Sequence, residues 1–142
     1  MKMNLREMTI DDHEVVYELW GKTDGIGLSD ADSKDGIRNF LARNPGLSFV
    51  ALDADSIVGA ALCGHDGRRG YIHHLSVLNS YRKQGIGRSL VNRCMFALIR
   101  LGITKCHLFV FGDNQGAIDF WKSVGWTHRG ELMMMSQYLD EG

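Results

Sequence analysis

The sequence predicts a mixed α/β fold, an α+β arrangement with a mostly antiparallel sheet of six or seven strands and about four flanking helices. Strand-like segments follow one another directly between residues 47 and 77, after two helical segments, which is typical of antiparallel pairing. A single helix then connects the strand ending at Val77 to the next strand, and such a crossover makes two strands parallel. This order does not fit a doubly wound parallel sheet.

The first third of the chain predicts one strand and two helices. A short strand is expected at residues 4–8, and Thr9-Ile10-Asp11-Asp12 has the spacing of a capping box. The helix that follows runs to about Gly21, with Val16 and Trp20 on its apolar side. A second helix is expected at residues 32–43, after an acidic, glycine-containing loop at residues 23–33. It ends at Asn44-Pro45-Gly46.

The remaining elements are predicted from alternation, helical periodicity and turn residues. Two strands joined by a turn precede the strand at residues 71–77, and a helix follows it. The expected strands are 47–52, 57–63, 71–77, 105–111, 126–129 and 133–138, and the expected helices are 85–101 and 114–124.

The stretch between Val77 and Leu90 has the features of an anion-binding turn. Two glycines and the cations Arg82, Lys83 and Arg88 lie between a strand and a helix. Glycines let a ligand approach the backbone, and the free N–H groups at a helix start favour phosphate. The alternative is a surface turn that the glycines merely close. Neither the nucleoside-triphosphate loop nor the dinucleotide fingerprint is present.

Two motifs in this order resemble the GNAT superfamily of N-acetyltransferases. Arg82-Lys83-Gln84-Gly85-Ile86-Gly87 resembles that family's acetyl-CoA loop, Gln/Arg-x-x-Gly-x-Gly/Ala. About thirty residues later, the run from Asn114 to Trp126 resembles its second signature, an Asn, a short helix, an aromatic residue and a Gly-aromatic pair. The resemblance covers essentially the whole chain and implies one acetyltransferase domain at residues 1–142.

The resemblance implies a set of residues that contact acetyl-CoA. The loop and helix start bind the pyrophosphate through backbone N–H groups, while the end of the central strand pairs with the pantetheine arm. A bulge near Leu75 and Ser76 is expected to free an N–H for the thioester oxygen. The predicted cofactor-binding residues are Leu75, Ser76, Val77, Arg82, Lys83, Gln84, Gly85, Ile86, Gly87, Arg88, Ser89, Asn114 and Trp121.

The groups that move protons are less well defined by the sequence. His73 and His74 are the candidate general bases, because imidazole accepts a proton near pH 7. Strand alternation places them on opposite faces, so at most one is expected to serve. A packed sheet histidine, a base acting through water, or no base remain alternatives. Many family members have a Tyr acid where this chain has Trp121, whose indole N–H is not a usable acid.

Composition excludes several other classes of function. With 142 residues, a net charge of −1 and no long apolar run, the chain is not expected to bind nucleic acid or a membrane. The three cysteines suit reduced thiols and a cytoplasmic location. No His or Cys spacing matches a zinc site, so no metal is expected.

The predicted function is transfer of an acetyl group from acetyl-CoA to a primary amine, on a small molecule or a peptide N-terminus, by direct attack in a ternary complex. The alternative is a non-catalytic acyl-CoA-binding regulator on the same scaffold, which the missing Tyr motivates. The carboxylates at residues 23–33 weakly favour a cationic acceptor. The run Met133-Met134-Met135 suggests a homodimer, although a core strand explains it equally well.

Overall fold

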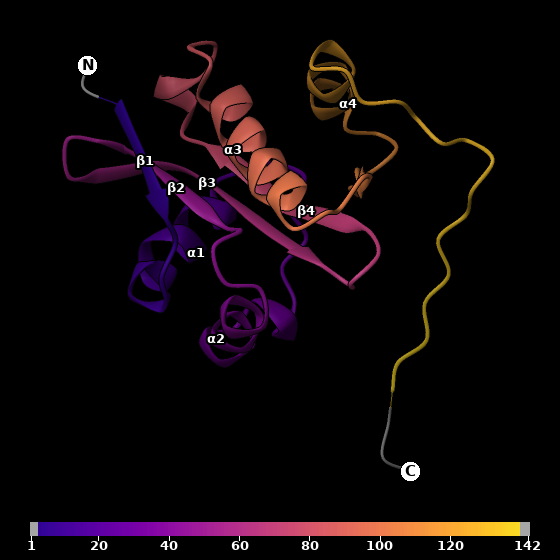
Figure 1. Ribbon diagram of the computed structural model, residues 1–142. Helices are drawn as coiled ribbons and strands as arrows, with labels where there is room; N and C mark the ends of the chain where they lie inside the picture. The colour runs from indigo at the N-terminus through magenta and orange to yellow at the C-terminus, as the bar shows by residue number, and fades with distance from the viewer. Residues whose placement is uncertain (1–2, 140–142) are drawn as a thin grey trace. The chain divides into compact units, whose positions relative to one another are not determined.

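A computed structural model describes residues 3–139, and the chain divides into two compact parts, Met1–Phe109 and Val110–Gly142. The first part holds the sheet and most of the helices (Figure 1). Its elements in chain order are β1 (Met3–Glu7), η1 (Ile10–Asp12), α1 (His13–Gly21), η2 (Asp30–Asp32), α2 (Lys34–Arg43), β2 (Phe49–Asp53), β3 (Ser56–His65), β4 (Gly70–Val77), η3 (Asn79–Tyr81), α3 (Ile86–Arg100) and β5 (Cys106–His107), where η denotes a short 3₁₀ helix.

The sheet has the strand order β1-β2-β3-β4-β5. Neighbouring strands from β1 to β4 are antiparallel, and β4 pairs with β5 in parallel, with Gly70 opposite Cys106. The mixed, mostly antiparallel sheet is therefore confirmed, as is the parallel crossover through α3. The described strands number five, fewer than the six or seven expected.

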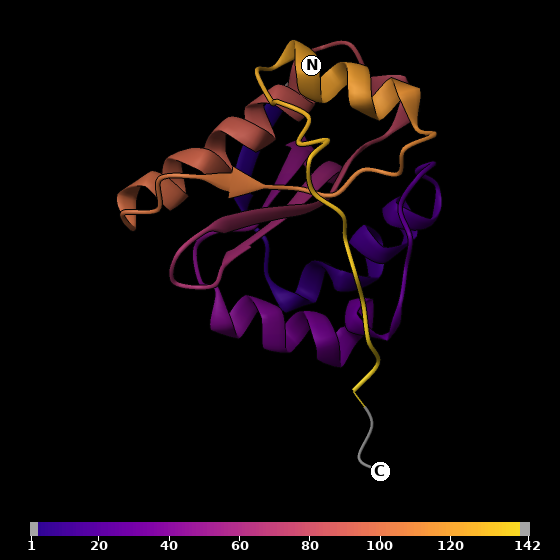
Figure 2. The ribbon, with the colours of Figure 1, turned by 90° about the vertical axis from the view of Figure 1, so that its right-hand side faces the viewer.

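Helices cover both faces of this sheet. Helix α3 packs on β2, β3 and β4 from one side, while α1 packs on β3 and β4 from the other, with α2 beside it (Figures 1 and 2). Val16, Trp20 and Leu62 belong to the core under α1 and α2. Leu90 and Cys94 of α3 are fully buried, as the helical periodicity of the sequence predicts. Strand β4 is thus held between two helical layers.

The second part contains one helix among its described residues, α4 (Gln115–Ser123). The Asn114 side chain caps it by accepting a hydrogen bond from the Ala117 N–H at 3.2 Å. After α4 the ribbon continues as an extended trace (Figure 1).

The strands expected at residues 126–129 and 133–138 were wrong, since neither segment forms a strand. The Leu132 N–H donates to the Arg129 carbonyl in a turn, but the flanking segments have no ladder. Three consecutive methionines give no alternation to select one face, and an isolated hairpin is only marginally stable. The strand expected at residues 105–111 is also shorter, because β5 pairs with β4 over two residues.

Candidate functional site

The loop between β4 and α3 presents a row of free backbone donors. Lys83 and Gly85 both have left-handed backbone conformations, with φ of +64° and +83°. Within residues 3–139, the amides of residues 83–88 make no hydrogen bond, and the first bonded amide is Ser89, which donates to the Gly85 carbonyl at 3.0 Å. Left-handed turns at a helix start form concave nests of N–H groups that bind anions. The geometry therefore fits a diphosphate.

The side chains of this loop divide into anchors and exposed cations. The Arg82 Nε donates to the Val77 carbonyl at 3.1 Å and ties the loop to the end of β4. The side chain of Ile86, the first residue of α3, is buried, so only its backbone faces a ligand. Lys83 and Arg88 are exposed and add positive charge beside the free amides. The loop thus combines a fixed backbone with exposed positive charge.

A cavity of about 260 Å³ lies next to this loop, inside the first part of the chain. Its walls come from the end of α1 and from the segment that follows β4. Lys22 and Arg82 both line it, so an anionic ligand here meets two cations. The sequence does not connect Lys22 with the site, because contact between α1 and this segment depends on the tertiary fold. The lining residues are Leu19, Lys22, Thr23, Val77, Leu78, Asn79, Ser80 and Arg82.

Strand β4 contains the expected bulge, centred one residue earlier than predicted. Leu62 pairs with His73 and Ala60 with Ser76, so two residues of β4, His74 and Leu75, lie opposite Ala61 alone. His74 has a left-handed φ of +52°. Such a bulge interrupts the ladder and leaves backbone groups without a cross-strand partner. The Ser76 side chain is buried and donates to the His74 carbonyl at 2.9 Å, so Ser76 has only its backbone to offer a ligand.

The bulge also overturns the expected alternation of the two histidines. The His73 ring lies 6.0 Å from the Phe40 ring of α2, and the His74 ring lies 5.0 Å from the Trp20 ring of α1. Both side chains therefore lie on the face covered by α1 and α2, with their ring centroids 6.5 Å apart. The physical reason is the extra residue, which turns His74 back toward the face that His73 already occupies.

The two imidazoles have different surroundings. Burial lowers the pKa of His73 below its usual value; the neighbouring His74 lowers it further, and Asp32 acts in the opposite direction. The His73 ring also stacks on Tyr71 at an interplanar angle of 9°. His73 is thus a packed sheet histidine and a weakened base.

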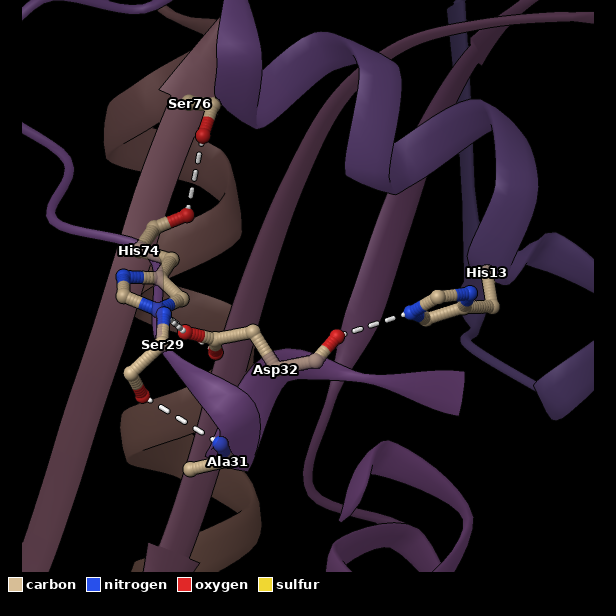
Figure 3. Close-up of polar contacts among 6 residues, drawn as sticks. All are labelled: His13, Ser29, Ala31, Asp32, His74 and Ser76. Carbon is tan, nitrogen blue, oxygen red and sulfur yellow. Dashed lines mark hydrogen bonds and ion pairs between the residues drawn. The ribbon is translucent and has the colours of Figure 1, made fainter. Parts of the chain in front are cut away.

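His74 is instead hydrogen-bonded to the buried carboxylate of Asp32 (Figure 3). Its Nε2 lies 2.8 Å from the Asp32 Oδ1, and the side chains of His74 and Asp32 are 19% and 8% exposed. The other carboxylate oxygen accepts the Ser29 N–H at 3.0 Å. The sequence groups Asp32 with the loop carboxylates that favour a cationic amine, but both of its oxygens are already engaged. No sequence signal connects residues 42 positions apart.

The second part of the chain holds Asn114 and Trp121. Asn114 uses its side-chain oxygen to cap α4, as described above. The Trp121 ring packs edge-on against Trp126, with centroids 5.1 Å apart, which is the arrangement of a core aromatic. The contacts of both residues with acetyl-CoA remain predictions.

The cysteines have no features of nucleophiles. Cys63 and Cys94 are buried free thiols, and their mutual hydrogen bond together with burial raises the pKa of Cys63. Burial raises the pKa of Cys106 to about 12. Cys63 and Cys106 therefore stay protonated at neutral pH, and a thiol is a poor nucleophile. Within residues 3–139, no group of three or more His, Cys, Asp or Glu residues is placed to hold a metal ion, and none of the helices is both long and apolar enough to cross a bilayer.

Comparison with known proteins identifies the family. The model of the acetyltransferase (GNAT) family matches residues 13–126. The chain is 32% identical over 139 residues to acetyltransferase SG1711 of Sodalis glossinidius, covering 98% of this chain and 97% of that protein. The chain therefore belongs to the GNAT family of acetyltransferases, which confirms the predicted family and class of enzyme.

Solved structures show the same fold at lower identity. The PaiA N-acetyltransferase of Thermoplasma acidophilum, in complex with coenzyme A, superimposes with a TM-score of 0.80 at 19% identity, covering 89% of this chain and 91% of that one. A predicted acetyltransferase of Clostridium acetobutylicum, with acetyl-CoA, gives a TM-score of 0.77 at 20% identity, covering 95% and 96%. These matches confirm the mixed α/β fold predicted from the sequence.

Proposed function

We propose that this chain transfers the acetyl group of acetyl-CoA to a primary amine, on a small molecule or a peptide N-terminus, by direct attack. The observation that carries the proposal is the row of free amides at residues 83–88, with left-handed turns at Lys83 and Gly85. The sequence of this loop, Arg82-Lys83-Gln84-Gly85-Ile86-Gly87, resembles the family's acetyl-CoA motif. The complexes of related folds with coenzyme A and acetyl-CoA support the choice of cosubstrate.

Binding is divided between the loop and the end of β4. The loop amides donate to the diphosphate oxygens, and Lys83 and Arg88 add charge complementarity. The backbone of Leu75, Ser76 and Val77 pairs with the amide groups of the pantetheine arm as an added strand does. The bulge at His74 and Leu75 supplies an unpaired N–H to polarise the thioester oxygen, where charge develops as the amine attacks.

The chemical step requires an unprotonated amine. His74 accepts a proton from the ammonium form of the acceptor, and the amine lone pair then forms the new C–N bond. The C–S bond then breaks, the nitrogen gives up its second proton to water, and the CoA thiolate takes up a proton from water. The products are an amide and free CoA, with the first proton left on His74 and later released to solvent. Trp121 cannot be the proton donor, because indole N–H is not acidic at neutral pH.

The binding half of the proposal is tested by placing a negative charge in the loop. Gly87→Glu directs a carboxylate toward the diphosphate, and we expect CoA affinity, measured by calorimetry, to fall at least about tenfold. Asn39→Glu, which adds the same charge at an exposed position of α2, is the matched control and leaves the affinity unchanged. Unchanged affinity in Gly87→Glu contradicts the assignment of the loop.

The catalytic half is tested by the release of free thiol from acetyl-CoA in the presence of a panel of primary amines. The proposal predicts amine-dependent release and an acetylated amine of the corresponding mass. CoA binding without release for any primary amine contradicts it and favours a non-catalytic regulator.

A further inference from the structure

We propose that Asp32 is the positioning residue for His74, fixing the proton on Nε2 so that Nδ1 is the atom that accepts the proton of the acceptor amine. This inference rests on the proposed function. It assigns a role in the reaction to Asp32, which lies outside the predicted site, in the segment between α1 and α2.

Asp32 is held from three directions (Figure 3). Its Oδ1 meets His74 Nε2 at 2.8 Å, its Oδ2 accepts the Ser29 N–H at 3.0 Å, and its backbone carbonyl lies 2.9 Å from His13 Nε2. The Ser29 Oγ accepts the Ala31 N–H and closes the same turn. The Asp32 carboxylate is therefore not free to turn toward a substrate. Outside its own turn, it only accepts the hydrogen bond from His74.

His74 is fixed as firmly as its partner. The Trp20 ring lies 5.0 Å from the imidazole at an interplanar angle of 60°, and the Ser76 hydroxyl donates to the His74 carbonyl. The left-handed φ of +52° is unfavourable for a residue with a side chain, and it persists because these contacts hold it. Strain of this kind concentrates at functional sites.

The tautomer follows from the pairing. A carboxylate only accepts hydrogen bonds, so the facing Nε2 must carry the proton, and the lone pair of the neutral ring is then on Nδ1. Within the described residues of the first part, Nδ1 makes no hydrogen bond, and the His74 side chain retains some exposure. An imidazole oriented by a buried carboxylate in this way is a prepared general base.

The alternative is that Asp32 only ties η2 to the sheet. The chain contains a matched control for that role, because Asp12 occupies the same position in η1. It accepts the Thr9 N–H at 2.9 Å, its side chain is also 8% exposed, and its ion pair, with Arg6, has the same length of 2.8 Å. Its partner is a guanidinium, which does not exchange protons at neutral pH.

The test compares Asp32→Asn with Asp12→Asn. In Asp32→Asn the side-chain amide oxygen can still accept from Ser29, but the NH₂ group then faces His74 and favours the proton on Nδ1. Long-range ¹H–¹⁵N correlation of the imidazole nitrogens reads the tautomer without any substrate, with His74→Asn assigning the signal. We expect Nε2–H in the wild type and in Asp12→Asn, and Nδ1–H in Asp32→Asn.

Acetyl transfer to an amine from the panel gives the second readout. Asp32→Asn is expected to lower kcat about 10- to 100-fold with little change in the KM for acetyl-CoA. Asp12→Asn is expected to keep kcat within about twofold, the level of change typical of an uncoupled site. A wild-type Nδ1–H tautomer, or equal losses in the two variants, overturns the role of Asp32. A wild type that binds CoA but acetylates no amine defeats the proposed function, and the catalytic role with it, whatever the tautomer.

Discussion

Two short turns, η1 and η2, are built alike and differ in one partner. Thr9-Ile10-Asp11-Asp12 and Ser29-Asp30-Ala31-Asp32 each place an Asp where it accepts the N–H of the first residue. Each carboxylate is buried, and each accepts a hydrogen bond of 2.8 Å from the side chain of a strand residue. Asp12 pairs with Arg6 of β1, whereas Asp32 pairs with His74 of β4.

The difference shows that one local motif can have two structural roles. Arg6 bonds both oxygens of Asp12, through Nη1 and Nη2 at 2.8 Å each, and the pair is a permanent link between β1 and η1. His74 bonds one oxygen of Asp32, the other oxygen accepts the Ser29 N–H, and within residues 3–139 the Nδ1 of His74 makes no hydrogen bond. The same turn therefore anchors a strand in one place and, in the proposed function, orients the base in the other.

The largest expected effect comes from removing the imidazole. His74→Asn is the appropriate change, because Asn tolerates a left-handed φ and separates loss of the base from backbone strain. We expect kcat for acetyl transfer to fall about 10²- to 10³-fold. His73→Phe, which keeps the aromatic stack on Tyr71, is expected to retain activity within a few fold. The reverse order of these two variants would make His73 the base.

A smaller effect is expected on the free energy of unfolding, and the two Asp→Asn variants should lower it by similar amounts. Asp12→Asn and Asp32→Asn each weaken a partly buried charged hydrogen bond, which costs about 1–2 kcal/mol. For a chain of this size the melting temperature falls by roughly 2–8 °C. Thermal denaturation followed by circular dichroism measures both. If only Asp32→Asn were destabilising, its loss of activity would reflect unfolding.

The smallest expected effect is a difference between the wild type and Asp12→Asn in how stability depends on pH in the acid range. The hydrogen bonds from Arg6 hold the pKa of Asp12 below its usual value of 3.8, so the folded state binds its proton less readily than the unfolded state. This contribution is complete above the unfolded pKa and is lost as pH falls through the folded pKa. The stability of Asp12→Asn should therefore decline less steeply below about pH 4 than that of the wild type. Parallel urea titrations from about pH 5 to about pH 3 check this, and equal slopes contradict it.

The features that the sequence predicted correctly are formed by residues that lie close together in the chain. The strand, the glycine-containing loop and the helix around residues 71–101 were predicted because turn residues, cations and apolar periodicity all lie within a few turns of one another. The pair of Asp32 and His74 was missed because it joins distant segments, and because the bulge includes His74, one residue earlier than predicted, and turns its side chain to the face of His73.

The prediction of the two C-terminal strands was wrong for a related reason. Met133-Met134-Met135 has the hydrophobicity of a strand without its alternation, so composition alone suggested pairing that the structure does not contain within its described residues. The contacts of Asn114 and Trp121 with the cosubstrate, and the predicted single domain at residues 1–142, remain predictions.

The claim on which the proposed function depends is that the backbone of residues 83–88 binds the diphosphate of acetyl-CoA. A crystal structure of the protein with acetyl-CoA tests it most directly. We expect diphosphate oxygens about 2.7–3.2 Å from several of these amide nitrogens, with the thioester beside the bulge at His74. A diphosphate bound elsewhere, with these amides still free, would contradict the account.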